Sequence, residues 1–249
     1  MNWKRRGHVF RPKRDKPWSV SHAQVPFAFL LNDKLRIYYA TRDKQSCSSV
    51  CYINVCPNKP EKILYEHDQP ILQKGKQGAF DDAGTMPSWF IEVENEIWMY
   101  YTAWNKCLSS SYRLSIGLAK SYDGGDSFKK CYYGPIMDRS ICDSVWVAQP
   151  SVIKFSSNDW RMWYLSCEKI ELINKIPEPF YNIKYATSTD GINWIRNGEI
   201  CIDFSHNIDA IGRPCVWLYE NVFYMLHSNR KANGYRKNPS ASYRLALSK

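Results

Sequence analysis

Apolar residues fall along this chain in short runs separated by polar turns, with hardly any helical periodicity, and this pattern is typical of β-strands. Four segments repeat one arrangement: a proline, a short apolar run, a polar turn with Asn or Asp, and an aromatic-rich run. They are residues 21–43, 81–105, 144–168 and 209–230. Each segment therefore predicts a β-hairpin of two short strands.

The prolines of these hairpins mark a regular period. Pro26, Pro87, Pro150 and Pro214 lie 61, 63 and 64 residues apart. The chain has 13 prolines, enough for one such coincidence, but four with matching flanks indicate an internal repeat of about 62 residues.

A second module follows the hairpins and predicts two more strands in each repeat. It reads "YRLSIGLAKSYDGGDSF" at 112–128 and "YNIKYATSTDGINW" at 181–194, and "ASYRLALSK" at 241–249 resembles its beginning. Fourth strands are expected at "QPIL" (69–72), "GPIM" (134–137) and "GEICI" (198–202). Four-stranded antiparallel units at a fixed period predict an all-β fold, a β-propeller. A β-sandwich is the main alternative, but it would not explain the repeat.

The Asp-Gly turns of the second module predict a structural role for two aspartates. "SYDGGDSF" fits the Asp-box form S-x-D-x-G-x-[ST]-[FW], and "STDGINW" is a shorter relative. Asp123 and Asp190 are expected to cap these turns through backbone N–H groups, with the aromatic residue packed between sheets.

The repeats divide residues 1–249, taken as a single propeller domain, into about four blades. Their approximate bounds are 20–72, 81–137, 143–204 and 208–249. Residues 2–10 resemble the stretch 193–202 and are a candidate strand that closes the last sheet, which would remove exposed sheet edges. A fifth blade outside this chain is the alternative.

Composition narrows the class of protein. Hydrophobic residues make up 44% and aromatic residues 15%, which favours a real core and carbohydrate-type binding surfaces. The net charge is +10, with seven Lys or Arg in the first sixteen residues, but no motif supports nucleic-acid binding. No apolar run approaches the length of a membrane span, and no secretory signal is recognisable. The oligomeric state stays open.

The cysteines favour a reducing compartment. There are nine, an odd number without a C-x-x-C pair, so reduced thiols and a cytoplasmic location are expected. Cys47, Cys51 and Cys56 are weak candidates for metal ligands, because strand alternation would point Cys56 away from the other two. No metal and no cofactor are therefore predicted.

One face of the propeller collects the candidate functional residues. The start of the first strand and the end of the second strand of each blade lie on this face, because the two strands are antiparallel. Candidate binding residues there are His22, Arg42, Asp43, Trp104, Asn105, Trp146, Arg213 and Arg230. Candidate catalytic residues are Asp82, Asp209 and Glu168, with Asp43 as a substitute.

Glycoside hydrolysis explains why carboxylates on this face matter. The reaction needs one protonated acid and one base or nucleophile across a cleft. Asp82 and Asp209 come from the second and fourth repeats, which lie across the axis of a four-bladed ring. The Trp and Arg side chains would stack on sugars or bind an anionic group such as phosphate or a uronate. Loop-holding ion pairs are the structural alternative for each carboxylate.

The repeat resembles the five-bladed β-propeller glycoside hydrolases of families 43 and 32. It is most similar to bacterial glycosylase-like proteins linked to surface-polysaccharide loci, which share stretches like "NWKRRGHVF", "FDDAGTMPSWF" and "SYRLSIGLAKSYDGGDSF". The resemblance covers essentially the whole chain. It implies that Asp82 matches the modulating aspartate and Arg213 the blade-four arginine. The base position, in "SVSHAQVP", has no carboxylate. The acid position holds Gln149, whose amide cannot donate a proton as an acid, so the resemblance implies Gln149 as a further candidate binding residue.

Three functions remain open on the sequence. The first is a carbohydrate-active enzyme, a glycosidase or glycoside phosphorylase. The second, favoured by the departures at the acid and base positions, is a non-catalytic glycan-binding or accessory propeller in polysaccharide biosynthesis. The third is a protein-interaction propeller without a small ligand, against which the polar, aromatic face argues. The partner expected under the first two is a carbohydrate or glycoconjugate.

Overall fold

The fold, taken from a computed structural model, is all-β, and no helix occurs in the residues that the structure describes. These are residues 7–31, 34–205, 208–235, 237–238 and 241–249. The strands are β1 (Ser21–Leu31), β2 (Lys34–Arg42), β3 (Ser48–Cys56), β4 (Lys59–Glu66), β5 (Gly84–Val93), β6 (Glu96–Cys107), β7 (Ser111–Ser121), β8 (Lys129–Lys130), β9 (Trp146–Lys154), β10 (Trp160–Ile173), β11 (Ile176–Ser188), β12 (Ile200–Ile202), β13 (Ala210–Tyr219), β14 (Val222–Arg230) and β15 (Arg244–Ser248).

The strands form consecutive antiparallel meanders. β1 to β4, β5 to β8 and β9 to β12 pair in chain order, and β13 to β15 form a shorter set within the described residues. At two junctions a single parallel pair joins the ladders of neighbouring meanders, Ser48 with Gly84 between β3 and β5, and Tyr181 with Ala210 between β11 and β13. The predicted repeat of four-stranded β units is therefore the organising unit of the fold.

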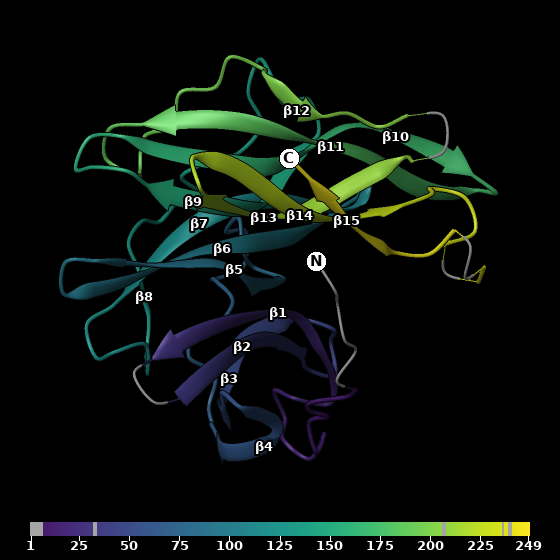
Figure 1. The fold of residues 1–249 in the computed structure, drawn as a ribbon. Helices are drawn as coiled ribbons and strands as arrows, with labels where there is room; N and C mark the ends of the chain where they lie inside the picture. The colour runs from purple at the N-terminus through teal and green to yellow at the C-terminus, as the bar shows by residue number, and fades with distance from the viewer. Residues whose placement is uncertain (1–6, 32–33, 206–207, 236, 239–240) are drawn as a thin grey trace.

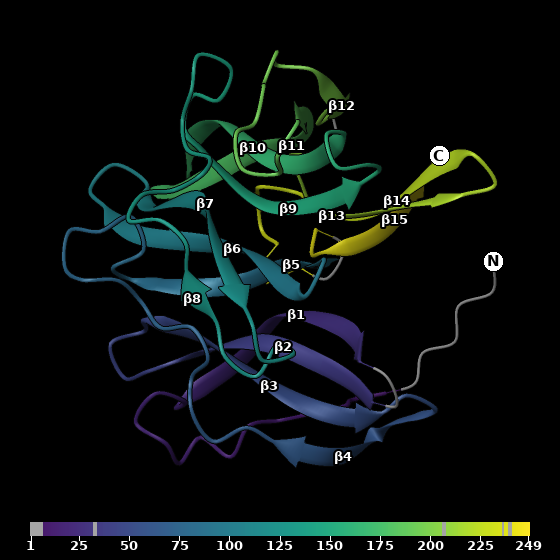
Figure 2. The same ribbon diagram turned by 90° about the vertical axis from the view of Figure 1, so that its left-hand side faces the viewer.

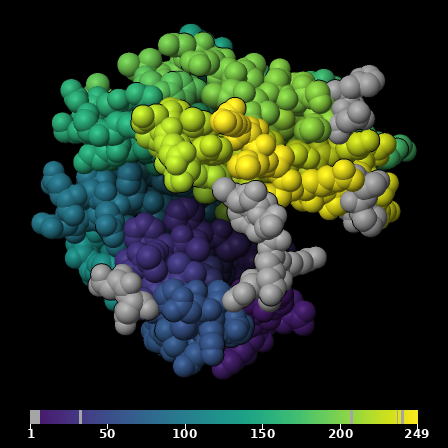
Figure 3. Space-filling model, in the orientation of Figure 1, coloured from purple at the N-terminus to yellow at the C-terminus, as the bar shows by residue number. Residues whose placement is uncertain are grey.

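The first strand of each meander lies toward the middle of the molecule. β1 contacts β5, β5 contacts β9, and β9 contacts β13. Figures 1 and 2 show these strands gathered centrally, while β4 and β12 lie at opposite outer edges in both views. Figure 3 shows the surface hollowed between the purple N-terminal sheet and the yellow C-terminal strands. This arrangement brings the four repeat prolines into one region.

Aromatic side chains fill the spaces between successive sheets. Tyr38 of β2 stacks on Phe90 of β5, with ring centroids 4.0 Å apart. Trp98 of β6 stacks in the same way on Trp160 of β10 at 5.4 Å. Trp163 belongs to the corresponding cluster between the third and fourth meanders. The aromatic-rich second strands of the repeat thus supply the core, because large rings bury the most apolar area per residue.

The outer strands differ in part from the sequence prediction. The stretch 198–202 contains β12, as expected. By contrast, 69–72 and 134–137 contribute only isolated bridges, Leu72 with Val50 and Met137 with Ile116, and the first meander has its fourth strand at β4 instead. An isolated bridge needs little alternation of apolar and polar residues, so the sequence does not distinguish it from a strand. Strand β4 is largely exposed and lacks an apolar face, so the alternation that predicts a strand is missing there.

The N-terminal segment does not add a strand to the last meander within the described residues. Residues 2–6 of the candidate closing strand 2–10 lie outside them, and residues 7–10 have no strand assignment. Val9 and Phe10 pack instead against the outer cluster of the first meander, where Phe10 lies 5.3 Å from Tyr39 between ring centroids. Apolar contact with β2 and β3 therefore positions this segment.

The Asp-Gly turns are capped by their aspartates and anchored on the preceding sheet. Asp123 Oδ1 accepts the backbone N–H groups of Asp126 and Ser127, both at 3.0 Å, and Asp190 Oδ1 accepts those of two following residues at 2.8 Å. The hydroxyl of Tyr38 donates to Gly125 O at 3.2 Å. The hydroxyl of Tyr100 donates to the carbonyl of the second turn at 2.7 Å. Each turn thus ties one meander to the next.

These turns predict an acid-sensitive contribution to stability. Burial raises the pKa of Asp123 and Asp190, but hydrogen bonds from Ser127 and Asn193 outweigh it and lower both pKa values from 3.8 to about 2. A carboxyl group whose pKa is lower in the folded state than in the unfolded state stabilises the fold at pH values above its unfolded pKa. This contribution is lost as the pH falls toward 2. We expect the Asp123→Asn, Asp190→Asn double variant to lose less stability than the unmodified protein between about pH 4 and pH 2. Denaturation in urea at each pH measures this; superimposable pH profiles would contradict it.

Candidate functional site

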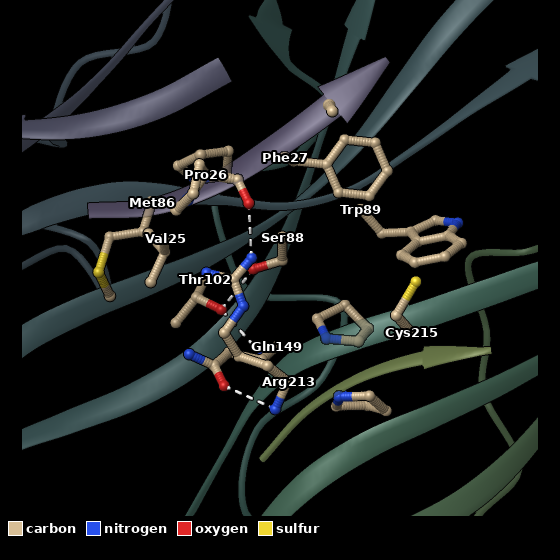
Figure 4. Close-up of a pocket in the computed structure, with 14 residues that line it drawn as sticks. Val25, Pro26, Phe27, Met86, Ser88, Trp89, Thr102, Gln149, Arg213 and Cys215 are labelled. Atoms are coloured by element: carbon tan, nitrogen blue, oxygen red, sulfur yellow. Dashed lines mark hydrogen bonds between the residues drawn. The ribbon is translucent and has the colours of Figure 1, made fainter. Parts of the chain in front are cut away.

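The four repeat prolines meet around a cavity of about 410 Å³ at the centre of the molecule. Its walls come from all four first strands and are largely apolar. The lining residues include Pro26, Phe27, Met86, Pro87, Ser88, Trp89, Thr102, Gln149, Pro150, Arg213, Pro214 and Cys215. Figure 4 shows the Arg213 side chain crossing this cavity from β13 toward β1.

A second cavity, of about 470 Å³, adjoins the first on the side where the first strands begin. Aromatic side chains dominate its wall. Its lining includes Tyr112, Leu114, Trp146, Leu165, Tyr181, Ser228 and Tyr243. The two cavities share three residues, Val25, Gln149 and Arg213. We call the two cavities together the channel and the three shared residues the bulge residues.

The bulge residues have the same unusual backbone. Each directly precedes a repeat proline, and each has a positive φ: 46° at Val25, 49° at Gln149 and 53° at Arg213. The ladder shifts register at all three places, as in a β-bulge. Positive φ is costly for non-glycine residues, and β-bulges are frequent where a strand must re-aim a side chain toward a site. The fold therefore maintains strained backbone where the two cavities adjoin.

Hydrogen bonds connect the bulge residues to the second meander. The backbone N–H of Arg213 donates to Gln149 Oε1 at 3.1 Å, which fixes the orientation of that amide. The backbone N–H of Gln149 donates to Thr102 Oγ1 at 3.0 Å, and Thr102 Oγ1 lies 2.7 Å from Ser88 Oγ. Arg213 Nη2 donates to Pro26 O at 2.7 Å (Figure 4). The guanidinium thus spans from the last meander to the first.

Arg213 lacks an ion-pair partner among the described residues. Burial lowers the pKa of its guanidinium, and the neighbouring Cys215 offsets this only in part. Arg213 is half-buried, so its charge is partly screened by water but has no carboxylate beside it among the described residues. No Asp or Glu occurs among the described residues that line the two cavities.

The candidate catalytic carboxylates bind groups in their own loops or on neighbouring strands. Asp82 Oδ2 accepts the N–H of Gly78 at 2.9 Å, and Asp209 Oδ2 accepts the N–H of Ala232 at 2.6 Å. Both therefore act as loop caps in different meanders. The preceding Asp81 is the buried member of its pair, and its carboxylate binds Lys130 at 2.5 Å. Of the two adjacent aspartates, Asp82 therefore caps a turn and Asp81 forms a buried ion pair. Neither of them lines the channel.

Glu168 and its substitute Asp43 are held in the same way. Glu168 Oε1 forms an ion pair with Lys184 Nζ at 2.6 Å and accepts the hydroxyl of Ser166 at 3.1 Å. Asp43 Oδ1 accepts the N–H groups of Gln45 and Cys47 at 2.9 and 2.8 Å. Neither residue lines the cavities. The catalytic roles of all four carboxylates stay predictions, and the structure gives each of them a local partner.

Several candidate binding residues lie beside the channel without lining it. The Arg42 guanidinium lies 5.3 Å from the Trp104 ring, and Trp104 Nε1 donates to Ser48 Oγ at 2.8 Å. His22 is exposed at the start of β1, and Asn105 is half-buried near the end of β6. Burial lowers the pKa of Arg42. Burial also lowers the pKa of His22, and the positive charge of Arg42 lowers the His22 pKa further. These residues form a separate group around the first two meanders.

Trp146 and Arg230 are more deeply buried than the sequence predicts. Trp146 is only 1% exposed and packs in a cluster with Tyr181, so its ring face is not free to stack on a sugar. Arg230 is 3% exposed and donates through Nε to the hydroxyl of Tyr181 at 3.2 Å, while the Tyr235 ring lies 4.0 Å from its guanidinium. Arg230 therefore supports the wall of the second cavity from behind.

The structure thus brings together three of the predicted residues, Trp146, Gln149 and Arg213, and adds others that the sequence interpretation missed. The added residues are Val25, Ser88, Thr102, Tyr112, Tyr181 and Tyr243. A signal for the bulge was present, since each bulge residue stands immediately before a repeat proline. Tyr112, Tyr181 and Tyr243 stand at or near the start of the second module of each repeat, for which the sequence predicted only a structural role.

Metal ligands and membrane segments are absent from the part of the chain that the structure describes. It holds no group of three or more His, Cys, Asp or Glu placed to bind a metal ion. Within the same residues no helix reaches the length and apolarity that crossing a membrane requires. The nine cysteines are unpaired.

Solved structures similar to this chain define the class of fold. The Cellvibrio cellulosa α-L-arabinanase aligns with a TM-score of 0.68 and 12% identity over 98% of this chain and 79% of its own. A complex of BT0996 with RGII gives 0.67 and 14% over 93% and 72%, and a thermostable family-43 glycoside hydrolase gives 0.64 and 13% over 94% and 73%. The chain therefore has the β-propeller fold of the glycoside hydrolases related to family 43.

Sequence comparison identifies the family. The chain is 32% identical over 235 residues to the uncharacterized protein MT1551 of Mycobacterium tuberculosis, covering 93% of this chain and 77% of the relative. It matches the uncharacterized protein Rv1502 of the same organism to the same extent. The chain belongs to the family of these two proteins. No protein-family model matches it.

Proposed function

We propose that this protein binds a glycan in the channel and does not cleave it by the two-carboxylate mechanism. The observation that carries the proposal is the lining of the channel, which has strained bulge residues, polar amide and guanidinium groups and aromatic walls, but no described Asp or Glu. Concave sites with apolar walls and a few fixed polar groups are typical of small-ligand binding.

The chemistry of hydrolysis explains why the missing carboxylates decide between the candidates. An acid must protonate the leaving oxygen, and a second carboxylate must act as base or nucleophile within about 5–10 Å. Gln149 occupies the middle of the channel, and its amide donates and accepts hydrogen bonds but supplies no proton to a leaving group. Asp82 caps its own loop through the Gly78 N–H, and Asp209 accepts the N–H of Ala232 in the loop after β14. A channel built in this way orients hydroxyl groups without catalysing bond cleavage.

The comparisons support a carbohydrate ligand. The similar structures include an α-L-arabinanase and the RGII complex of BT0996. They also favour the second candidate, a glycosidase-like enzyme, in which Asp82, Asp209 or Glu168 would act after rearrangement of their loops. The two candidates differ in what happens to a bound glycan and in which residues it depends on.

Titration calorimetry with a panel of arabino-, xylo-, fructo- and uronic-acid oligosaccharides tests the proposal. We expect at least one member to bind without release of reducing ends. Gln149→Leu should weaken binding by about 10-fold or more, because it removes two hydrogen-bonding atoms from the channel. Asp82→Asn is the matched control and should leave binding unchanged, since asparagine keeps an acceptor for the Gly78 N–H.

Two outcomes would contradict this account. Cleavage of an oligosaccharide that disappears in Asp82→Asn would establish the enzyme candidate. Absence of binding across the whole panel, with folded protein confirmed by its thermal transition, would leave the channel without a glycan role.

A further inference from the structure

We propose that the channel recognises an anionic group on its glycan, a carboxylate or a phosphate, and that Arg213 binds this group. The inference rests on the proposed function, because it assumes that a glycan occupies the channel, and it goes further by naming the chemistry of the ligand. Its basis is an imbalance of charge and of hydrogen-bond donors at the bulge residues.

The charge imbalance is centred on Arg213. Its guanidinium has five N–H donors, and one hydrogen bond, from Nη2 to Pro26 O, is formed with the described residues. No described carboxylate pairs with it or lines either cavity. The chain as a whole carries a formal net charge of +10. The guanidinium of this half-buried residue therefore has N–H donors left for an anion, and charge-assisted hydrogen bonds to a carboxylate or phosphate are stronger than neutral ones.

Donors also outnumber acceptors around Arg213. Gln149 Oε1 and Pro26 O already accept from Arg213, while no acceptor among the described residues binds Gln149 Nε2. Ser88 and Thr102 share one hydrogen bond, so one of their two hydroxyl protons is left over. Trp146 Nε1, beside the second cavity, is buried without a described partner. A ligand rich in acceptor oxygens satisfies these groups, and a carboxylate or phosphate offers the most per atom.

The position of Arg213 suits recognition of a substituent on a sugar. It is one of the bulge residues that border both cavities, so an anion bound there is reachable from either side. Its backbone is fixed by the strained bulge and by the Gln149 hydrogen bond. Such pre-organisation lowers the entropy lost on binding. The same side chain also braces β13 against Pro26 of β1, so its replacement can change stability as well as binding.

The experiment compares a uronic-acid oligosaccharide with its methyl ester, which has the same shape without the charge. Hexose 6-phosphate and the free hexose form a second pair that distinguishes a phosphate from a carboxylate. Each probe is titrated into the unmodified protein, Arg213→Gln and Arg213→Lys. The control is Arg161→Gln, because Arg161 pairs with Asp159 and stacks on Phe155 outside both cavities.

We expect the charged member of at least one pair to bind the unmodified protein about 10- to 100-fold more tightly than its neutral partner, as hydrogen bonds to charged groups allow. Arg213→Gln should abolish this preference and leave the neutral member unchanged. Arg213→Lys should retain part of it, and Arg161→Gln all of it. The preference should also shrink as salt rises.

Equal affinity for the charged and neutral members in the unmodified protein would overturn the inference, and this comparison decides even if Arg213→Gln does not fold. Equal weakening of both members in Arg213→Gln would also overturn it. Neutral glycans that bind in a Gln149-dependent way and as tightly as their charged partners would leave the proposed function standing and refute only the anion. Failure of every probe and every panel glycan to bind would refute both.

Discussion

Replacing Asp143 with alanine is expected to lower the free energy of unfolding by about 3–5 kcal/mol. The Asp143 carboxylate is fully buried and accepts the hydroxyls of Tyr164 and Ser166 at 3.2 and 2.7 Å. Arg196 Nη1 binds it at 2.8 Å, and Lys184 Nζ lies 3.7 Å away. The hydroxyl of Ser140 also donates to it, at 2.9 Å, so removing the carboxylate leaves two cations and three hydroxyls without this partner, which is far more costly than losing a surface pair.

Urea denaturation followed by tryptophan fluorescence measures this loss. Asp159→Ala is the control, because its exposed carboxylate pairs with Arg161 at the surface and should contribute less than about 1 kcal/mol. A loss below about 1 kcal/mol for Asp143→Ala would show that this cluster does not hold the third meander together. The same network binds Glu168 through Lys184, so the variant also tests whether Glu168 is structural.

Replacing Gly84 with alanine is expected to destabilise the protein by about 3–5 kcal/mol. Gly84 has φ of +148°, a conformation that side chains rarely allow, at the single residue pair joining β3 to β5. A Cβ there would lie 2.2 Å from Ser48 Oγ and 2.6 Å from Trp104 Nε1. The Ser48 backbone cannot retreat without losing its hydrogen bond to Ala83 O, so the junction between the first two meanders would open.

Gly134→Ala provides the matched control for this prediction. No heavy atom lies within 4 Å of the Cβ that this substitution would add, so the same change of residue should cost little. The two variants are compared by their urea midpoints and slopes. Similar midpoints for Gly84→Ala and Gly134→Ala would mean that the close approach at Ser48 is not required.

The sequence predicted the repeat because its signals are local. Pro26, Pro87, Pro150 and Pro214 mark the first strands. The turns at Glu94-Asn95 and Glu220-Asn221 join hairpins, and positive φ values occur there at Glu94, Glu220 and Asn221. The turn expected at 32–33 lies outside the described residues. The outer strands were harder to predict. Isolated bridges and the exposed strand β4 show little alternation of apolar and polar residues in the sequence.

The direction of individual side chains was less predictable. Asp81 and Asp82 precede β5 in a turn, where the two-residue alternation of a strand does not apply, and the buried one is Asp81. The bulges at Gln149 and Arg213 also shift register, so counting positions back from each proline does not tell which side chains enter the channel. Arg213 was placed on the candidate face by the strand pattern and Gln149 by family resemblance, whereas Tyr112 and Tyr181 required the fold.

A crystal structure with the tightest-binding oligosaccharide from the panel tests the central claim most directly. The account predicts an intact glycan in the channel, in contact with Gln149 and Arg213, and no part of it within hydrogen-bond distance of Asp82 or Asp209. A glycan bound outside the channel, or a cleaved glycan between two carboxylates, would contradict it.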